Sequence, residues 1–300
     1  PKTDWRLYDR YGYFPFDEVE EESVSRTLEC CYDDYCASLF ARALGKEEDA
    51  AFFARRAGFY RNLFDPETEL VRGKDSRGAW RTPFNRYVTS HAGTAGGDYT
   101  EGNAWQYTWH VQHDVEGLIG LLGGRERFCE KLDTLFTVSR DIRNDGFSDD
   151  VTGLIGQYAH GNEPSHHVAY LYALAGRPDR TQELIRTICK TQYRPGPEGL
   201  CGNEDCGQMS AWYIFSVLGF YPVNPCGGDY VLGAPQLPSA TLQLPGGKTF
   251  RVVAENLSEE NRYVEKVLLN GALVEGPVLR HADILEGGEL RFIMTDRPTI

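Results

Sequence analysis

From about residue 23 to residue 220, apolar residues recur mainly every three or four positions, the spacing of amphipathic helices. Glycine-containing breaks at Gly45, at Gly123-Gly124 and at Gly176-Arg177-Pro178 separate successive segments, as in antiparallel helical hairpins. This part of the chain is therefore predicted to consist of paired helices. The predicted helices lie near 24–44, 47–64, 110–122, 125–138, 166–175, 179–192 and 207–219.

After Pro222 the pattern changes to short runs in which apolar and polar residues alternate, as they do in strands. The turn signals Pro245-Gly246-Gly247, Asn270-Gly271 and Gly287-Gly288 separate these runs. A small antiparallel β-domain is therefore predicted, with a boundary near residues 222–228 and domains at 1–224 and 225–300. The predicted strands are 229–232, 240–244, 249–254, 264–269 and 289–293.

Two polar, glycine-rich stretches, 72–97 and 144–164, interrupt the helical part. Both are longer than ordinary connections between paired helices, which have about two to eight residues. Long loops at one end of a helical array commonly carry binding and catalytic residues. We therefore look for function in these loops.

Composition narrows the class of protein. The 300 residues are 41% hydrophobic and 25% charged, as in a globular protein, and the formal charge of −13 argues against a nucleic-acid partner.

The eight cysteines lack CxxC spacing and are too sparse for a disulfide scaffold, so we expect mostly free thiols. The apolar stretches, such as 213–218, are too short for a membrane span. Residues 1–10 lack an initiator Met and a signal core, so we expect a piece of a longer protein.

Three clusters, 99–107, 160–167 and 202–208, combine carboxylates, amides and aromatic residues before predicted helices. Helix capping is one reading of all three. Pro164 suits the first position of a helix, so Asn162 and Glu163 could cap it and complement its dipole. Asp205 could cap the helix near 207–219, and Glu101 could be a first-turn carboxylate.

A catalytic reading follows if the three helix starts converge. Glycoside hydrolysis requires one protonated carboxylic acid and one carboxylate on opposite sides of the sugar ring, and acids on separate loops can supply both. Their separation distinguishes inverting enzymes, at about 6.5 to 9.5 Å, from retaining ones, at about 5 to 5.5 Å. The sequence leaves that distance open.

The chain resembles glycoside hydrolase family 92, a family of calcium-dependent exo-α-mannosidases, over essentially all of its length. Several long motifs in the family's order carry the resemblance. They are Ser23-Val24-Ser25-Arg26-Thr27-Leu28-Glu29, Tyr32-Asp33-Asp34, Arg81-Thr82-Pro83-Phe84, the segment 99–107 followed by His113-Asp114, the segments 160–167 and 202–212, and Gly219-Phe220-Tyr221-Pro222.

The resemblance implies an N-terminal β-sandwich, an (α/α)6 barrel, inversion at the anomeric carbon and a Ca²⁺ ion that binds two hydroxyls of the terminal mannose. Twelve helices form such a barrel and seven are predicted here. We therefore expect a mainly α chain with the later part of the barrel followed by the β-domain, completed by a missing N-terminal domain and inactive alone. The resemblance further implies mannose-containing glycans as partners, α-1,2 linkages, and a secreted or periplasmic location.

The family pattern also implies residue roles. It makes Glu101 the general acid and Asp205 the general base, with Asn162, Glu163 and Asp205 around the calcium ion. Carboxylate and amide oxygens are the ligands that Ca²⁺ prefers. Asn203 departs from the pattern, because some relatives have Asp there and an amide cannot relay a proton.

Three residues are predicted to contact the sugar: Trp105, His160 and Asn203. For Trp105 a place in the core is an equally open reading, since aromatic residues commonly fill cores. The pair Asp33-Asp34 lies within a predicted helix, where pairing with another helix and a role at the site are both open.

A zinc site made by His166, His167, Cys201 and Cys206 is not predicted, because adjacent histidines on a helix point in different directions and the cysteine spacing is unlike that of zinc ligands. Rival hypotheses are a non-catalytic glycan-binding protein, another (α/α)6 glycosidase and a structural scaffold. The presence of both Glu101 and Asp205 favours an enzyme, and a scaffold would leave the three clusters unexplained.

Overall fold

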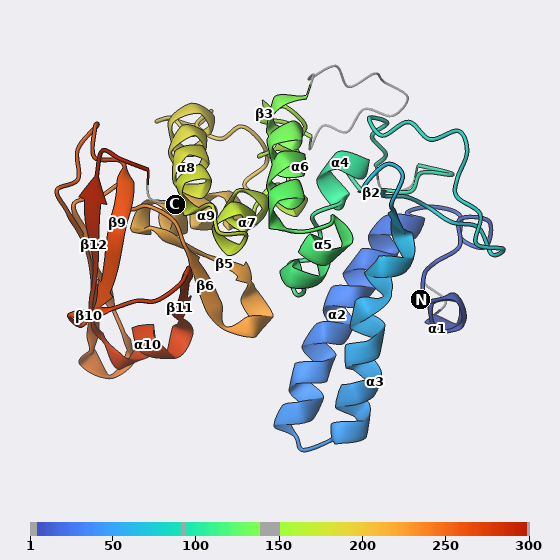
Figure 1. Ribbon diagram of the computed structural model, residues 1–300, viewed down its shortest axis with the longest axis horizontal. Helices are drawn as coiled ribbons and strands as arrows, with labels where there is room; N and C mark the ends of the chain where they lie inside the picture. Colours follow the sequence, from blue (N-terminus) through green and yellow to red (C-terminus); the bar gives the residue numbers. More distant parts are fainter. Residues whose placement is uncertain (1–4, 92–93, 139–150, 299–300) are drawn as a thin grey trace. The chain divides into compact units, whose positions relative to one another are not determined.

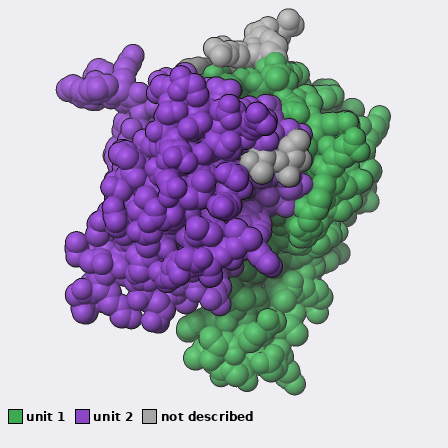
Figure 2. Space-filling model, turned by 60° about the vertical axis from the view of Figure 1, so that its left-hand side comes forward, with its two compact units in different colours: residues 1–164 green, residues 165–300 purple. Residues whose placement is uncertain are grey.

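The computed structural model describes residues 5–91, 94–138 and 151–298. The chain forms two compact units, residues 1–164 and 165–300, which Figure 2 colours separately. Residues 1–4 of the predicted N-terminal stretch, 92–93 of the first predicted loop and 144–150 of the second lie outside the described residues.

Unit 1 begins with helix α1 (Trp5–Tyr11) and a helical hairpin, α2 (Ser23–Ala43) and α3 (Glu47–Ala57), which lie side by side in Figure 1. The hairpin was predicted at 24–44 and 47–64, and Gly45 adopts the left-handed conformation (φ 71°) at the turn. One difference is that α3 tightens into a 3₁₀ helix at Gly58–Leu63.

An ion pair joins the two helices of this hairpin. Arg56 Nε donates to Asp34 Oδ2 at 2.8 Å, and both side chains are largely buried. Burial raises the pKa of Asp34, and the hydrogen bond from Arg56 opposes that rise. Asp34 of α2 thus pairs with Arg56 of α3, and pairing with another helix was one of the two interpretations of this residue.

The rest of unit 1 is short helices and two-residue strands. The helix predicted at 110–122 begins only at Val115, because Asp114 Oδ1 accepts a hydrogen bond from Gly117 N at 2.9 Å and so caps it. The helix predicted at 125–138 is confirmed. These elements are α4 (Ala104–Tyr107), α5 (Val115–Leu121), α6 (Arg125–Thr137), β1 (Phe64–Asp65), β2 (Leu70–Val71), β3 (Leu154–Ile155) and β4 (Tyr158–Ala159).

Unit 2 starts with the helices α7 (Leu171–Leu174), α8 (Pro178–Gln192) and α9 (Gln208–Leu218). The last two agree with the predicted 179–192 and 207–219. The helix predicted at 166–175 is instead a 3₁₀ turn, Val168–Tyr170, followed by the single turn of α7. In the described part of the chain no helix is long and apolar enough to cross a bilayer.

Two sheets follow in unit 2, and each predicted strand is present. The first has the order β11-β6-β5 and the second β10-β9-β12-β8-β7. Their strands are β5 (Phe220–Asn224), β6 (Asp229–Leu232), β7 (Ser239–Gln243), β8 (Thr249–Glu255), β9 (Tyr263–Leu269), β10 (Ala272–Leu273), β11 (Val278–Arg280) and β12 (Gly288–Thr295).

The predicted antiparallel arrangement holds for every pairing in these sheets except one. Strands β8 and β12 run parallel, with Gly288 opposite Phe250. The chain reaches β12 through a crossover that includes the short helix α10 (His281–Glu286), which brings it back in the direction of β8.

The core of the larger sheet is apolar, and Phe250, Leu290 and Phe292 are fully buried within it. Helix α8 packs against β9 in the same unit, where Gln182 Oε1 accepts a hydrogen bond from Val264 N at 3.1 Å. The change from helices to strands lies between the end of α9 at Leu218 and the start of β5 at Phe220, inside unit 2. The predicted domains, 1–224 and 225–300, stay a prediction.

Candidate active site

Glu101, the predicted general acid, lies in the loop before α4 with a left-handed backbone (φ 51°). Three hydrogen bonds hold the loop. Gly102 N donates to Ser90 O and Ser90 N to Gly102 O, each at 3.1 Å, and Asn162 Nδ2 donates to the Glu101 carbonyl at 2.7 Å. These contacts come from distant parts of unit 1, so tertiary structure imposes the conformation.

The carboxylate of Glu101 is about one third exposed, and its Oε1 lies 3.8 Å from His91 Nε2. It does not act as a first-turn carboxylate of α4, so that capping alternative is wrong. Asn103 caps the helix instead: its Oδ1 accepts from Trp105 N at 2.9 Å, while Gln106 Oε1 accepts from Asn103 N at 2.7 Å. Glu101 is therefore left beside the helix start with its side chain accessible.

Two of the predicted sugar contacts are buried in unit 1. Trp105 is 2% exposed, and Lys131 Nζ lies 5.0 Å from the centre of its ring. His160 is fully buried, with Nδ1 2.8 Å from the hydroxyl of Tyr158. Trp105 therefore lies in the core, which was one of the two interpretations of this residue. Sugar contact by either residue stays a prediction.

The predicted calcium residues of unit 1 adjoin the Glu101 loop. Asn162 is buried, and its Oδ1 accepts a hydrogen bond from Glu163 N at 3.2 Å while its Nδ2 holds the Glu101 carbonyl. Glu163 is half-buried and begins a 3₁₀ turn, Glu163–Ser165. The structure thus joins Glu101 to the neighbouring pair Asn162 and Glu163, which follows it by 61 residues or more in the sequence.

Asp205, the predicted general base, belongs to unit 2 and lies on the exposed loop before α9. Three successive residues are left-handed, Asp205 (φ 49°), Cys206 (φ 56°) and Gly207 (φ 98°). Gly207, not Asp205, occupies the cap position of α9, so the capping interpretation of Asp205 is wrong. Asn203 is exposed on the same loop.

Glu204 holds this loop, a role that the sequence analysis missed. Its carboxylate accepts hydrogen bonds from Ser210 N at 3.2 Å and from Ser210 Oγ at 3.0 Å, and its carbonyl accepts from Met209 N at 3.2 Å. An acid just before a helix start was the available signal. We call the Glu204–Ser210 contact the Glu204 clasp.

The N-terminal half of α9 makes polar contacts with His166. Gln208 Nε2 lies 3.0 Å from His166 Nδ1, and Trp212 Nε1 donates to the His166 carbonyl at 2.8 Å. Within residues 5–91, 94–138 and 151–298, no three His, Cys, Asp or Glu side chains form a group that could hold a metal ion. His166 is thus engaged in supporting α9.

Both predicted catalytic carboxylates therefore lie on residues with left-handed backbones. Residues other than glycine adopt this conformation uncommonly, at a cost of order 1 to 3 kcal/mol that the surrounding structure must offset. Such strain concentrates at functional sites. For Glu101 the hydrogen bonds of Ser90 and Asn162 offset it, and for Asp205 the Glu204 clasp restrains the loop.

A mainly helical chain with a β-domain, carrying separate acids on strained loops, is consistent with a glycoside hydrolase. The model of the glycosyl hydrolase family 92 catalytic domain matches residues 2–296, and the chain belongs to this family. The resemblance inferred from the motifs is thereby confirmed.

Solved structures of relatives agree with the fold. The family GH92 α-mannosidase BT3965 from Bacteroides thetaiotaomicron, in complex with mannoimidazole, is 45% identical and matches 98% of this chain with a TM-score of 0.91. The inverting mannosidase BT2199 from the same organism is 39% identical, again over 98% of the chain, with a TM-score of 0.85. The predicted fold class, helical with a small β-domain, is confirmed.

A curated relative, described as an uncharacterized secreted glycosidase from Arthroderma benhamiae, is 29% identical over 94% of this chain. The chain spans only about two fifths of these relatives, 38% of the Arthroderma protein, 39% of BT3965 and 40% of BT2199.

Proposed function

We propose that the complete protein removes terminal α-linked mannose from glycans with inversion of configuration. Family membership and the likeness to two α-mannosidases, one of them named as inverting, support the reaction class. The observation that carries the proposal is that Glu101 and Asp205 both stand on strained loops outside ordinary helix-capping roles. We further propose α-1,2 specificity and a secreted or periplasmic location.

In this proposal Glu101 acts as the general acid and protonates the departing glycosidic oxygen. Asp205 acts as the general base and takes a proton from the water that attacks the opposite face of the sugar. Trp105, His160 and Asn203 would contact the sugar. Because position 203 is an amide, Asp205 must accept the proton itself rather than through that side chain.

Asn162, Glu163 and Asp205 are proposed to hold a Ca²⁺ ion. Their carboxylate and amide oxygens fit its preference, and the amide oxygen of Asn162 has a lone pair beyond the one that accepts Glu163 N. Water, backbone carbonyls and the sugar diol would complete six to eight ligands. When bound, the ion would orient and polarise the diol of the terminal mannose.

The proposed activity is tested on the complete protein with α-1,2-mannobiose and an aryl α-mannoside, with calcium or with excess chelator. Proton NMR of the first product distinguishes inversion, which releases β-mannose, from retention. Binding of mannobiose without turnover would instead identify a glycan-binding protein. We propose that the 300-residue chain alone is inactive. Turnover by it equal to that of the complete protein would contradict this.

Replacing Glu163 with Ala is expected to weaken calcium binding more than folding. The change removes an oxygen ligand, while Pro164 still supports the 3₁₀ turn that residue 163 begins. Calorimetric titration with Ca²⁺ and the thermal midpoint would be measured together. Glu126→Ala is the matched control, because Glu126 is an exposed acid in the first turn of α6. Unchanged calcium affinity in Glu163→Ala, or full wild-type activity in excess chelator, would contradict the calcium site.

Replacing Ser210 with Ala is expected to lower kcat about tenfold with little change in KM. It removes the hydroxyl half of the Glu204 clasp and lets the Asp205 loop move, and a displacement near 1 Å can cost about 10²-fold in rate. Ser210→Thr, which keeps the hydroxyl, should restore most of kcat. Ser239→Ala, at an exposed position on β7, is the control. An unchanged kcat in Ser210→Ala would show that the clasp does not position the base.

A further inference from the structure

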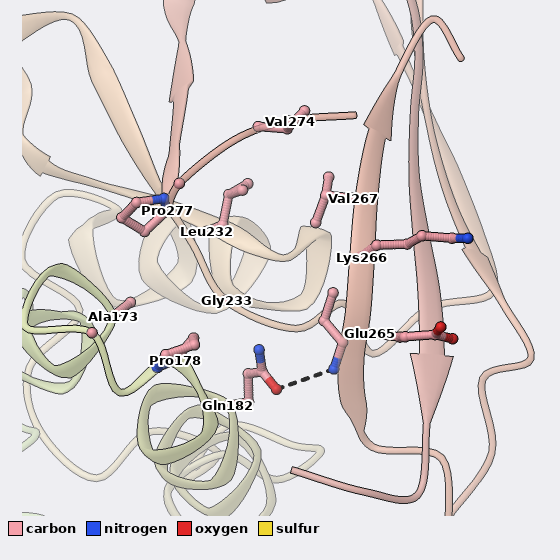
Figure 3. A pocket seen from close by; sticks show the side chains of 13 residues that line it. Ala173, Pro178, Gln182, Leu232, Gly233, Glu265, Lys266, Val267, Val274 and Pro277 are labelled. Carbon is pink, nitrogen blue, oxygen red and sulfur yellow. Dashed lines mark hydrogen bonds between the residues drawn. The ribbon is translucent and has the colours of Figure 1, made fainter. Parts of the chain in front are cut away.

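Unit 2 contains a cavity of about 340 Å³ beside strand β9, apart from the Asp205 loop. Figure 3 shows it between the turn joining α7 and α8, the end of β6, strand β9 and the segment 274–277. None of the residues assigned to sugar cleavage or calcium binding lines it. Its volume is within the usual range of small-molecule sites, about 300 to 1,000 Å³.

The walls of this cavity are mostly apolar. Apolar side chains face the cavity in Figure 3, among them Leu232, Val267, Val274 and Pro277. The exposed side chains of Glu265 and Lys266 on β9 also border it, but their charged ends point away. A charged ligand would lose its hydration without gaining an ionic partner here. The lining therefore selects for a neutral molecule with an apolar body.

One polar side chain, that of Gln182, points into the cavity. Gln182 is only 5% exposed, and its Oε1 accepts a hydrogen bond from Val264 N at 3.1 Å. Its Nε2 points into the cavity in Figure 3 and makes no hydrogen bond within the described residues. A side-chain amide nitrogen carries two N–H groups, so the cavity offers a donor to an incoming acceptor.

Hydrogen bonds around the rim hold the walls in place. Leu232 N donates to Pro277 O at 2.7 Å, and Val274 N donates to Val267 O at 2.9 Å. The bond from Val264 N fixes the side chain of Gln182. A preformed site of this kind loses little conformational entropy when it binds a ligand.

We propose that this cavity binds a neutral small molecule with a largely apolar body and a carbonyl oxygen that accepts from Gln182 Nε2. Its volume equals that of roughly eleven liquid water molecules at about 30 Å³ each, enough for a single substituted ring. A sugar fits poorly, because its many hydroxyls would find one side-chain donor among apolar walls. The site is independent of the proposed mannosidase activity.

Acetanilide, a neutral aromatic amide, is the probe, and its binding to the 300-residue chain is measured by saturation-transfer NMR and calorimetry. Val274→Phe, which fills the cavity, should abolish binding. Gln182→Glu keeps an acceptor for Val264 N but removes the donor, and should weaken binding about tenfold, the effect of one lost hydrogen bond. Lys266→Ala, whose side chain points outward, is the control.

Binding that disappears in Val274→Phe and weakens in Gln182→Glu, with Lys266→Ala unchanged, supports the proposal. No binding of acetanilide up to its solubility limit would overturn it. Equal binding by Val274→Phe would also overturn it, since the probe would then lie elsewhere. Thermal midpoints of each variant establish folding, and the substitution at the half-buried Val274 gives a test that does not depend on Gln182→Glu being stable.

Discussion

Replacing Glu101 with Gln in the complete protein is expected to lower kcat about 10²- to 10⁴-fold on mannosides with poor leaving groups. The amide keeps the size of the side chain but cannot donate the proton that the departing oxygen needs. The loop should persist, because its hydrogen bonds involve the backbone of Glu101 and Gly102, together with Ser90 and the side chain of Asn162. Steady-state kinetics on α-1,2-mannobiose measures the loss.

The choice of leaving group provides the decisive comparison for Glu101. An activated aryl mannoside departs without protonation, so its hydrolysis should fall much less than that of mannobiose. Glu48→Gln, at an exposed position of α3, controls for a general effect of removing a carboxylate. Normal turnover of both substrates by Glu101→Gln would show that another group donates the proton.

Replacing Asp205 with Asn should lower kcat on both substrates by a similar factor, about 10²- to 10⁴-fold, since activation of water is needed whatever group leaves. The structure makes this a clean test. Asn adopts the left-handed conformation more readily than most residues, so the backbone at Asp205 (φ 49°) should be retained. The carboxylate is removed while the loop remains.

The control for this variant is Asp296→Asn, at an exposed position beyond β12. The thermal midpoint of Asp205→Asn should stay near that of the parent, because Asp205 is exposed and does not cap α9. A large fall in stability would indicate that Asp205 supports the fold. An unchanged kcat would assign the base to another residue.

Local patterns determined the elements and much of the candidate chemistry. The hairpin of α2 and α3 and each predicted strand follow from spacing and turn residues, which act over a few positions. The clusters around Glu101, Asn162 and Asp205 were visible because residue types alone identify possible acids and oxygen ligands. The same local rules favoured helix caps at these places, and for Glu101 and Asp205 that reading failed.

Tertiary contacts decided how those residues are presented. Asn162 reaches the carbonyl of Glu101, and Glu204 holds the start of α9. These contacts help to keep the backbone at Glu101 and Asp205 left-handed, which is uncommon for residues other than glycine. The parallel pairing of β8 and β12 and the donor of Gln182 beside β9 likewise depend on segments distant in sequence. Such contacts form only when the whole chain folds, because their free energy comes from burial and hydrogen bonds between elements rather than from local propensity.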